Sequence, residues 1–145
     1  MKRTRGERGT ALVEAALTIP ILLLISVGIF EFGRAYQTWQ ILTNAAREGA
    51  RIAVLPNAAQ SAVEARVREY MQGGQLPKYS EASVTLNRNA TLTINGQPVT
   101  ASLVTVDYPF NFIVLKPVAR LIAPATSLGS PLTMRATALM RNEAQ

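Results

Sequence analysis

The first third of the chain is dominated by one apolar run. Residues 10–30 read TALVEAALTIPILLLISVGIF, 21 residues with a single ionisable side chain, Glu14. At about 1.5 Å per residue, a helix of this length covers the roughly 30 Å hydrocarbon core of a bilayer. A soluble core helix would carry a polar face, whereas residues 19–30 offer only Ser26. The pattern therefore predicts a transmembrane helix over residues 10–33, preceded by a leader (1–9) and followed by a stem helix and domain (34–145).

Beyond residue 30 the apolar positions keep a helical spacing. They recur mostly three or four residues apart, at Phe32, Ala35, Tyr36, Trp39, Leu42, Ala46, Ala50, Ala53 and Val54. This stripe predicts that the helix continues as an amphipathic stem until Pro56. From Leu42 onward we interpret the stripe as the face that packs on the rest of the domain. Tyr36 and Trp39 lie about where aromatic side chains gather at a membrane surface.

The remainder predicts an α+β domain. Asn57 is placed as the N-cap of a second helix over residues 58–71, which Gly73 and Gly74 close. Alternating segments predict strands at residues 82–87, 91–96, 100–108 and 132–141, with a turn at Asn95-Gly96. The expected fold is thus a long N-terminal transmembrane and stem helix, a shorter helix and a small antiparallel sheet of three or four strands.

An apolar segment interrupts the predicted strands. Residues 110–129 read FNFIVLKPVARLIAPATSLG and contain two prolines. We interpret this segment as a loop with a short helix. It would either cap the sheet, which we prefer, or lie near the membrane surface or a partner.

The charge of the chain is uneven. The net charge is +6, and half of that excess lies in the first nine residues, where Lys2, Arg3, Arg5 and Arg8 face only Glu7. Because basic residues stay on the cytoplasmic side of a membrane helix, the N-terminus is expected in the cytoplasm and residues 34–145 outside it. The bulk charge gives little support to nucleic-acid binding, so no nucleic-acid partner is expected.

A cleaved secretory signal peptide is the first alternative for this segment. Such a peptide has the same basic start and apolar run, followed by small residues at a cleavage site. Here the run passes into FEFGRAYQTWQ, which is bulky and charged. The pattern therefore favours a helix that is retained.

Glu14 is unusual because a carboxylate inside a membrane helix is costly unless it has a partner or lies near the headgroups. Gly9, four further residues and Glu14 match the processing pattern of type IV prepilins. A cut between Gly9 and Thr10 would place a new ammonium group one helical turn from Glu14, in the same subunit or a neighbour, where the two charges would pair. The alternative is that Glu14 lies near the headgroups, at the favourable end of the helix dipole.

The following stretch resembles the TadE-like family of tight-adherence pilus systems, firmly over residues 6–55. The matching pieces are Gly9, Val13-Glu14, Ala16-Leu17, Pro20, Glu31-Phe32-Gly33-Arg34 and, most distinctively, Ala45-Ala46-Arg47-Glu48-Gly49-Ala50-Arg51. One departure is Ala15, where these proteins often carry an aromatic residue. The resemblance implies a minor pseudopilin with a pilin-like fold, processed by a prepilin peptidase. It would lie in the inner membrane of a bacterium and take part in assembling a thin adhesive pilus with other pilins, pseudopilins and inner-membrane platform proteins.

Three further features of the helix are candidates for a role in assembly. Pro20 removes a backbone hydrogen bond and would bend the helix or be tolerated without effect. Glu31 and Arg34 can pair where the helix leaves the membrane, and Arg47, Glu48 and Arg51 form a second charged cluster. A solvated helix face is the default interpretation of these charges, and the alternative is that they set orientation or partner choice.

The sequence offers no catalytic chemistry. It has no histidine and no cysteine, one aspartate (Asp107) and no Gly-rich phosphate loop. An enzyme, a metal, a cofactor and a small-molecule substrate are therefore not expected, and membrane lipid is the one non-protein partner. The alternative function is an unprocessed single-pass binding module of the cell envelope that never enters a filament.

Overall fold

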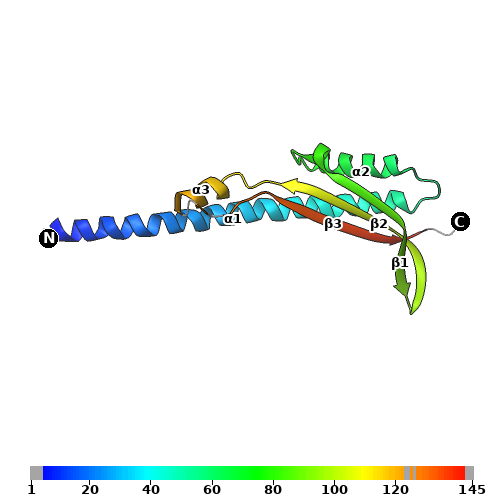
Figure 1. Ribbon diagram of the computed structural model, residues 1–145, viewed down its shortest axis with the longest axis horizontal. Helices are drawn as coiled ribbons and strands as arrows, with labels where there is room; N and C mark the ends of the chain where they lie inside the picture. Colours follow the sequence, from blue (N-terminus) through cyan, green and yellow to red (C-terminus); the bar gives the residue numbers. More distant parts are fainter. Residues whose placement is uncertain (1–4, 123–124, 126, 143–145) are drawn as a thin grey trace. The chain divides into compact units, whose positions relative to one another are not determined.

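The structure, a computed structural model, describes residues 5–122, 125 and 127–142 (Figure 1). It comprises three helices, a short 3-10 turn and three strands within this part of the chain. Their bounds are α1 (Arg5–Ala53), α2 (Gln60–Gly73), the turn Tyr79–Glu81, β1 (Ser83–Ile94), β2 (Gln97–Phe110), α3 (Leu115–Ile122) and β3 (Leu132–Arg141). The strands form one antiparallel sheet in the order β1-β2-β3. The α+β fold expected from the sequence is confirmed.

Helix α1 is continuous from residue 5 through the apolar run to Ala53. Within the run, the Thr18 hydroxyl donates to the Glu14 carbonyl at 2.9 Å and the Ser26 hydroxyl to the Leu22 carbonyl at 2.8 Å. Both hydroxyls therefore bond to the helix itself, which removes most of the cost of placing them in an apolar medium. The helix also passes through Pro20, and a bend at that residue stays a prediction.

The chain forms two compact units. One comprises Met1–Arg34 and Asn111–Pro131, and the other comprises Ala35–Phe110 and Leu132–Gln145. Helix α1 contributes residues to both. Each unit is described separately below.

The larger unit has its core between the second half of α1, helix α2 and one face of the sheet. Small residues of α1 are fully buried there, together with Leu42. Helix α2 contributes Val63, Val67 and Met71, and β2 contributes Val104 and Val106. This burial confirms that the stripe from Leu42 onward is a packing face.

The sheet differs from expectation at its first strand. The segments predicted at 82–87 and 91–96 are one strand, β1, whose pairing with β2 shifts between Asn87 and Ala90. The two polar residues in this gap interrupt the alternation, and they form a bulge instead of a turn. The predicted Asn95-Gly96 turn is confirmed, since both residues have positive φ (51° and 77°) and connect β1 to β2.

The start of α2 also differs from expectation. Asn57 is not its N-cap: Asn57 has φ 60° in the preceding turn, and the helix begins at Gln60 after Ala59, which makes no side-chain cap hydrogen bond. At the other end, the N–H of Gly74 donates to the Tyr70 carbonyl, which confirms the predicted closure.

The smaller unit contains the predicted short helix, α3, beside the first part of α1 (Figure 1). The chain after α3 folds back onto its first turn at Gly129, which is buried and has φ 75°. A Cβ at this position would lie 2.6 Å from the Lys116 nitrogen, so the close approach requires glycine. The segment groups with the first part of α1 in one compact unit, and its interpretation as a cap on the sheet stays a prediction.

Candidate functional site

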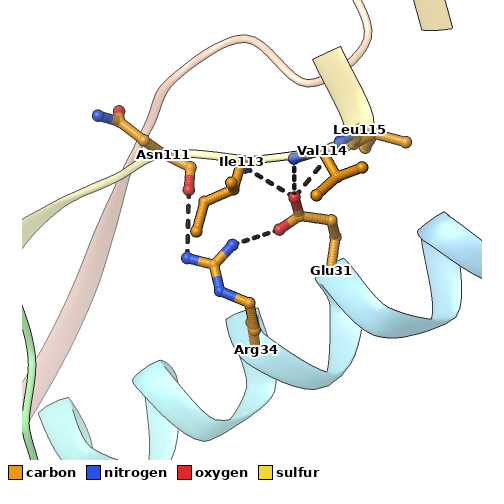
Figure 2. A network of polar contacts seen from close by, with 6 residues as sticks. All are labelled: Glu31, Arg34, Asn111, Ile113, Val114 and Leu115. Atoms are coloured by element: carbon orange, nitrogen blue, oxygen red, sulfur yellow. Dashed lines mark hydrogen bonds and ion pairs between the residues drawn. The ribbon is translucent and has the colours of Figure 1, made fainter. Parts of the chain in front are cut away.

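A buried carboxylate connects α1 to the segment before α3 (Figure 2). Glu31 follows the apolar run directly, and none of its surface is exposed. Its Oε1 atom accepts backbone hydrogen bonds from Ile113 at 2.7 Å, Val114 at 2.5 Å and Leu115 at 3.3 Å. Successive N–H groups at the start of a helix have no partners within it, so an anion there is stabilised by them and by the helix dipole. Glu31 thus caps α3.

Arg34 completes this arrangement. Its Nη1 forms an ion pair with Oε2 of Glu31, and its Nη2 donates to the Asn111 carbonyl at 3.5 Å (Figure 2). The predicted pairing of Glu31 with Arg34 is therefore confirmed. The solvated-face interpretation does not hold for Glu31, because its carboxylate is buried and bonded on both oxygens. We name these residues, with Asn111 and the backbone of Ile113–Leu115, the Glu31 latch.

One face of α1, on the N-terminal side of the latch, is partly covered. Leu24 and Val27, which precede Glu31 by two turns and one turn, are partly covered, whereas Ile25, Ile29 and Phe30 on the other faces are exposed. Leu115 and Ala119 of α3 are buried. Helix α3 therefore turns its apolar inner face toward the last turns of the apolar run.

The rest of the apolar run is bare. Its large side chains, such as Leu12, Leu17 and Ile19, are 60–72% exposed. Among the described residues, the one helix long and apolar enough to cross a membrane extends over Gly9–Ala53, and its most apolar window has no buried residue. A core helix of a soluble protein would be covered, so this helix could instead span a bilayer.

The predicted processing site lies within helix α1. Gly9, Thr10 and Glu14 are all helical and exposed. A Cβ added at Gly9 would meet no atom within 4 Å. No salt bridge of Glu14 is found among the described residues. Its pairing with an ammonium at Thr10 stays a prediction.

The second predicted charged cluster is only partly formed. Glu48 accepts from Arg51 at 3.2 Å, as expected, but its second oxygen pairs with Arg66 of α2, also at 3.2 Å. Arg47 is exposed on a different side of the helix and takes no part in these pairs. The hydrogen bond from Arg66 lowers the pKa of Glu48 below its ordinary value, and Arg51 adds to this effect. The cluster therefore ties α1 to α2.

The segment AAREGAR combines this cluster with a close-packing face. Ala45, Ala46 and Ala50 are fully buried. At Gly49, an added Cβ would lie 2.5 Å from Cγ2 of Val67 and 3.3 Å from Cγ1 of Val104. Small residues here let α2 and β2 approach the helix closely, while the charged positions face outward.

The C-terminal end of α1 is held by residues that the sequence alone did not single out. Arg88, at the β1 bulge, donates to the carbonyls of Ala53 (3.1 Å) and Ala58. Ser102 is fully buried, and its hydroxyl oxygen lies 3.4 Å from the Ala53 carbonyl oxygen and 2.7 Å from the Asn142 amide oxygen. A bulge in an otherwise alternating strand was the available signal for Arg88.

Nothing in the described part of the chain forms a catalytic constellation. No cluster of three metal-ligating side chains lies among these residues. The charged groups are arranged as structural pairs, and the chain has no histidine or cysteine.

The fold and the site define a class of protein in which a helix able to cross a membrane continues into an α+β domain. The Glu31 latch lies where the apolar run of that helix ends. The family model described as TadE-like protein matches residues 9–51, which confirms the resemblance over this part of the chain. The match covers Gly9, Glu14, Pro20, the Glu31-Arg34 pair and AAREGAR. The TadE-like family is associated with pili and is not a family of enzymes. No curated protein matches the chain, and no solved structure does.

Proposed function

We propose that the protein is a minor pseudopilin that takes part in assembling a tight-adherence (Flp-type) pilus. The observation that supports this most strongly is the coincidence of the TadE-like match at residues 9–51 with a bare apolar helix. The uncovered part of this helix, which includes Leu12, Leu17 and Ile19, needs another apolar environment, which a bilayer or neighbouring pilin helices would provide.

In this proposal α1 anchors the protein in the bacterial inner membrane. The basic leader stays in the cytoplasm, and the domain from residue 34 onward lies outside it. Its partners are membrane lipid, a prepilin peptidase, other pilins and pseudopilins, and the platform proteins of the pilus machine. Exposed side chains on α1, including Tyr36 at 62% and Arg47, are available to these partners.

Cleavage between Gly9 and Thr10 is the first testable part. The bond lies just after the first turn of α1, and glycine is a poor helix former, so local unwinding for a peptidase costs little. Mass spectrometry of the membrane-extracted protein should find a chain beginning at Thr10 in cells with the peptidase and an intact chain without it. Gly9→Val should block cleavage without disturbing packing, because the space around Gly9 is open.

Gly28→Val is the matched control, since a Cβ at Gly28 also meets no atom within 4 Å. This variant should be processed like the wild type. An intact N-terminus in peptidase-positive cells would refute processing, and Glu14 would then lose its proposed ammonium partner.

Participation in assembly is tested separately by photo-crosslinking. A benzoylphenylalanine at Tyr36 should capture pilins or platform proteins in cells that express the pilus system. The same group at Gln72, which is exposed on α2, serves as a control for nonspecific capture. Crosslinks only to an unrelated envelope protein would instead support the unprocessed binding module.

A further inference from the structure

The Glu31 latch fixes the depth of α3 relative to the apolar run. Glu31 follows residue 30 directly and bonds to the first turn of α3, and α3 lies beside the part of α1 that precedes Glu31 (Figure 1). The partial cover over Leu24 and Val27 agrees with this placement. If residues 10–30 span the hydrocarbon core, the Glu31 latch lies at its extracytoplasmic edge, and α3 lies just inside that edge, beside the last two turns of the run.

The composition of this segment suits that level. Asn111–Pro131 contains Lys116 and Arg120 but no aspartate or glutamate. The two basic residues are four apart, so they share one side of α3. Ile113 is 64% exposed, and Pro117 is exposed as well. The outer side of the segment thus combines apolar and basic groups, while Leu115 and Ala119 face inward.

These features distinguish lipid from a protein partner. Exposed apolar side chains beside basic ones are typical of helices that lie in the plane of a membrane surface, where the long basic side chains reach phosphate groups. The adjoining apolar run is continuous with this surface and needs the same environment. A protein partner would have to supply acidic groups, whereas a bilayer spanned by residues 10–30 would itself bring phosphates to the level of the latch.

We infer that α3 and the preceding Ile113 form an interfacial membrane element of the extracytoplasmic leaflet. Ile113 lies at the boundary of the acyl and headgroup regions, and the long side chains of Lys116 and Arg120 extend from α3 to phospholipid phosphates. The Glu31 latch holds the element against α1, so the anchor is broader at this leaflet than a single helix. This inference rests on the proposal that α1 spans a bilayer.

Fluorescence quenching of the full chain in lipid nanodiscs tests the inference. The chain has no cysteine, so single substitutions carry one environment-sensitive label each. The positions are Ile113→Cys, Ile21→Cys within the apolar run and Gln72→Cys on exposed α2. The nanodiscs contain phosphatidylethanolamine and phosphatidylglycerol, with lipids spin-labelled near the headgroup or at the chain centre. Iodide, which stays in the aqueous phase, quenches each label according to how accessible that label is from water.

At position 113 we expect strong quenching by the headgroup-level spin label and iodide quenching at least about threefold weaker than at position 72. Position 21 should be quenched by the chain-centre label. Quenching at 21 together with full iodide access at 113 would overturn the inference about α3 and leave the membrane-spanning helix in place. Lack of lipid quenching at 21 would overturn the spanning helix and, with it, the inference.

A second variant tests the basic residues. Lys116→Gln combined with Arg120→Gln should raise iodide access at position 113 toward that at position 72 and weaken headgroup-level quenching. Replacing phosphatidylglycerol with phosphatidylcholine should have a smaller effect in the same direction. If position 113 is protected only after pilus proteins are added, α3 binds protein and the inference is wrong.

Discussion

The Oε1 atom of Glu31 lies 2.7 Å from the backbone nitrogen of Ile113, 82 residues later in the chain. The contact connects the end of the apolar run to the segment that joins β2 to β3. A buried carboxylate is costly without compensation, and here three N–H groups and the Arg34 guanidinium supply it. The segment is thus held by one side chain with several strong bonds.

Glu31→Ala should release this segment. The substitution leaves three N–H groups and Arg34 without their acceptor, which we expect to cost about 2–3 kcal/mol. At about 1.4 kcal/mol per tenfold change, local opening increases about 30-fold or more. Hydrogen exchange of residues 113–119, measured by mass spectrometry on the full chain in detergent, should accelerate accordingly. Glu31→Gln retains one acceptor oxygen and should have an intermediate effect.

The matched control for this experiment is Glu81→Ala. Glu81 is exposed and pairs with Lys78 at 3.5 Å on the surface. Exchange of residues 113–119 should be unchanged in this variant. If Glu31→Ala also leaves their exchange unchanged, the latch does not hold the segment.

Gly49→Ala should destabilise the larger unit. The new Cβ would lie 2.5 Å from Val67, a buried β-branched side chain with little freedom to move. Alanine improves helix propensity by up to about 1 kcal/mol, but overpacking costs about 1–3 kcal/mol, so a net loss is expected. Thermal unfolding of the full chain in detergent should show a lower melting temperature.

Gly73→Ala is the control for the same change at an open position. Gly73 also lies in a helix, and a Cβ there meets no atom within 4 Å. The melting temperature should stay the same or rise slightly. A Gly49→Ala variant as stable as Gly73→Ala would show that α1, α2 and β2 approach less closely than described.

The sequence predicted the elements whose signals are local. Periodicity identified α1 and its packing stripe from Leu42 onward, and Asn95-Gly96 identified the hairpin. The break at Asn87 within β1 was read as a strand end, since a bulge and a turn both interrupt alternation. Asn57 was read as an N-cap because its residue type suits caps and left-handed turns equally.

The candidate site was only partly predictable for a different reason. Spacing on one helix predicts that Glu31 can reach Arg34 and that Glu48 can reach Arg51, and both pairs form. The other partners are backbone N–H groups at 113–115 and Arg66 of α2, which depend on tertiary structure. No local pattern separates a carboxylate that binds a distant backbone from one on a solvated face.

Asp107 should make stability depend on acid pH. Asp107 lies opposite Arg135 in the β2–β3 register and accepts two hydrogen bonds from it, at 2.7 and 3.0 Å. The hydrogen bond from Arg135 lowers the pKa of Asp107. A lowered pKa stabilises the fold above the unfolded value, about 3.9, and this contribution is lost as the pH falls through the lower folded pKa.

Asp107→Asn should therefore lower the melting temperature slightly at neutral pH and not at all once Asp107 is protonated in both states. The effect is small because Arg135 is 68% exposed. Thermal unfolding of the wild type and of Asp107→Asn across the acid pH range measures this difference in melting temperature. A difference between them that persists at the lowest pH would assign the loss to packing and not to charge.

Arg88→Met should loosen the C-terminal end of α1. Methionine keeps most of the side-chain length but donates no hydrogen bond, so the carbonyls of Ala53 and Ala58 lose the guanidinium, a cation that favours a helix C-terminus. Loss of bonds to a charged donor costs about 1.5–3 kcal/mol. Exchange of the Val54 and Leu55 amides, which bond to the last turn of α1, should accelerate at least about tenfold. Arg141→Met, at an exposed position at the end of β3, is the matched control and should leave both amides unchanged. Equal exchange in the two variants would mean that the bulge does not position Arg88 to hold the helix end.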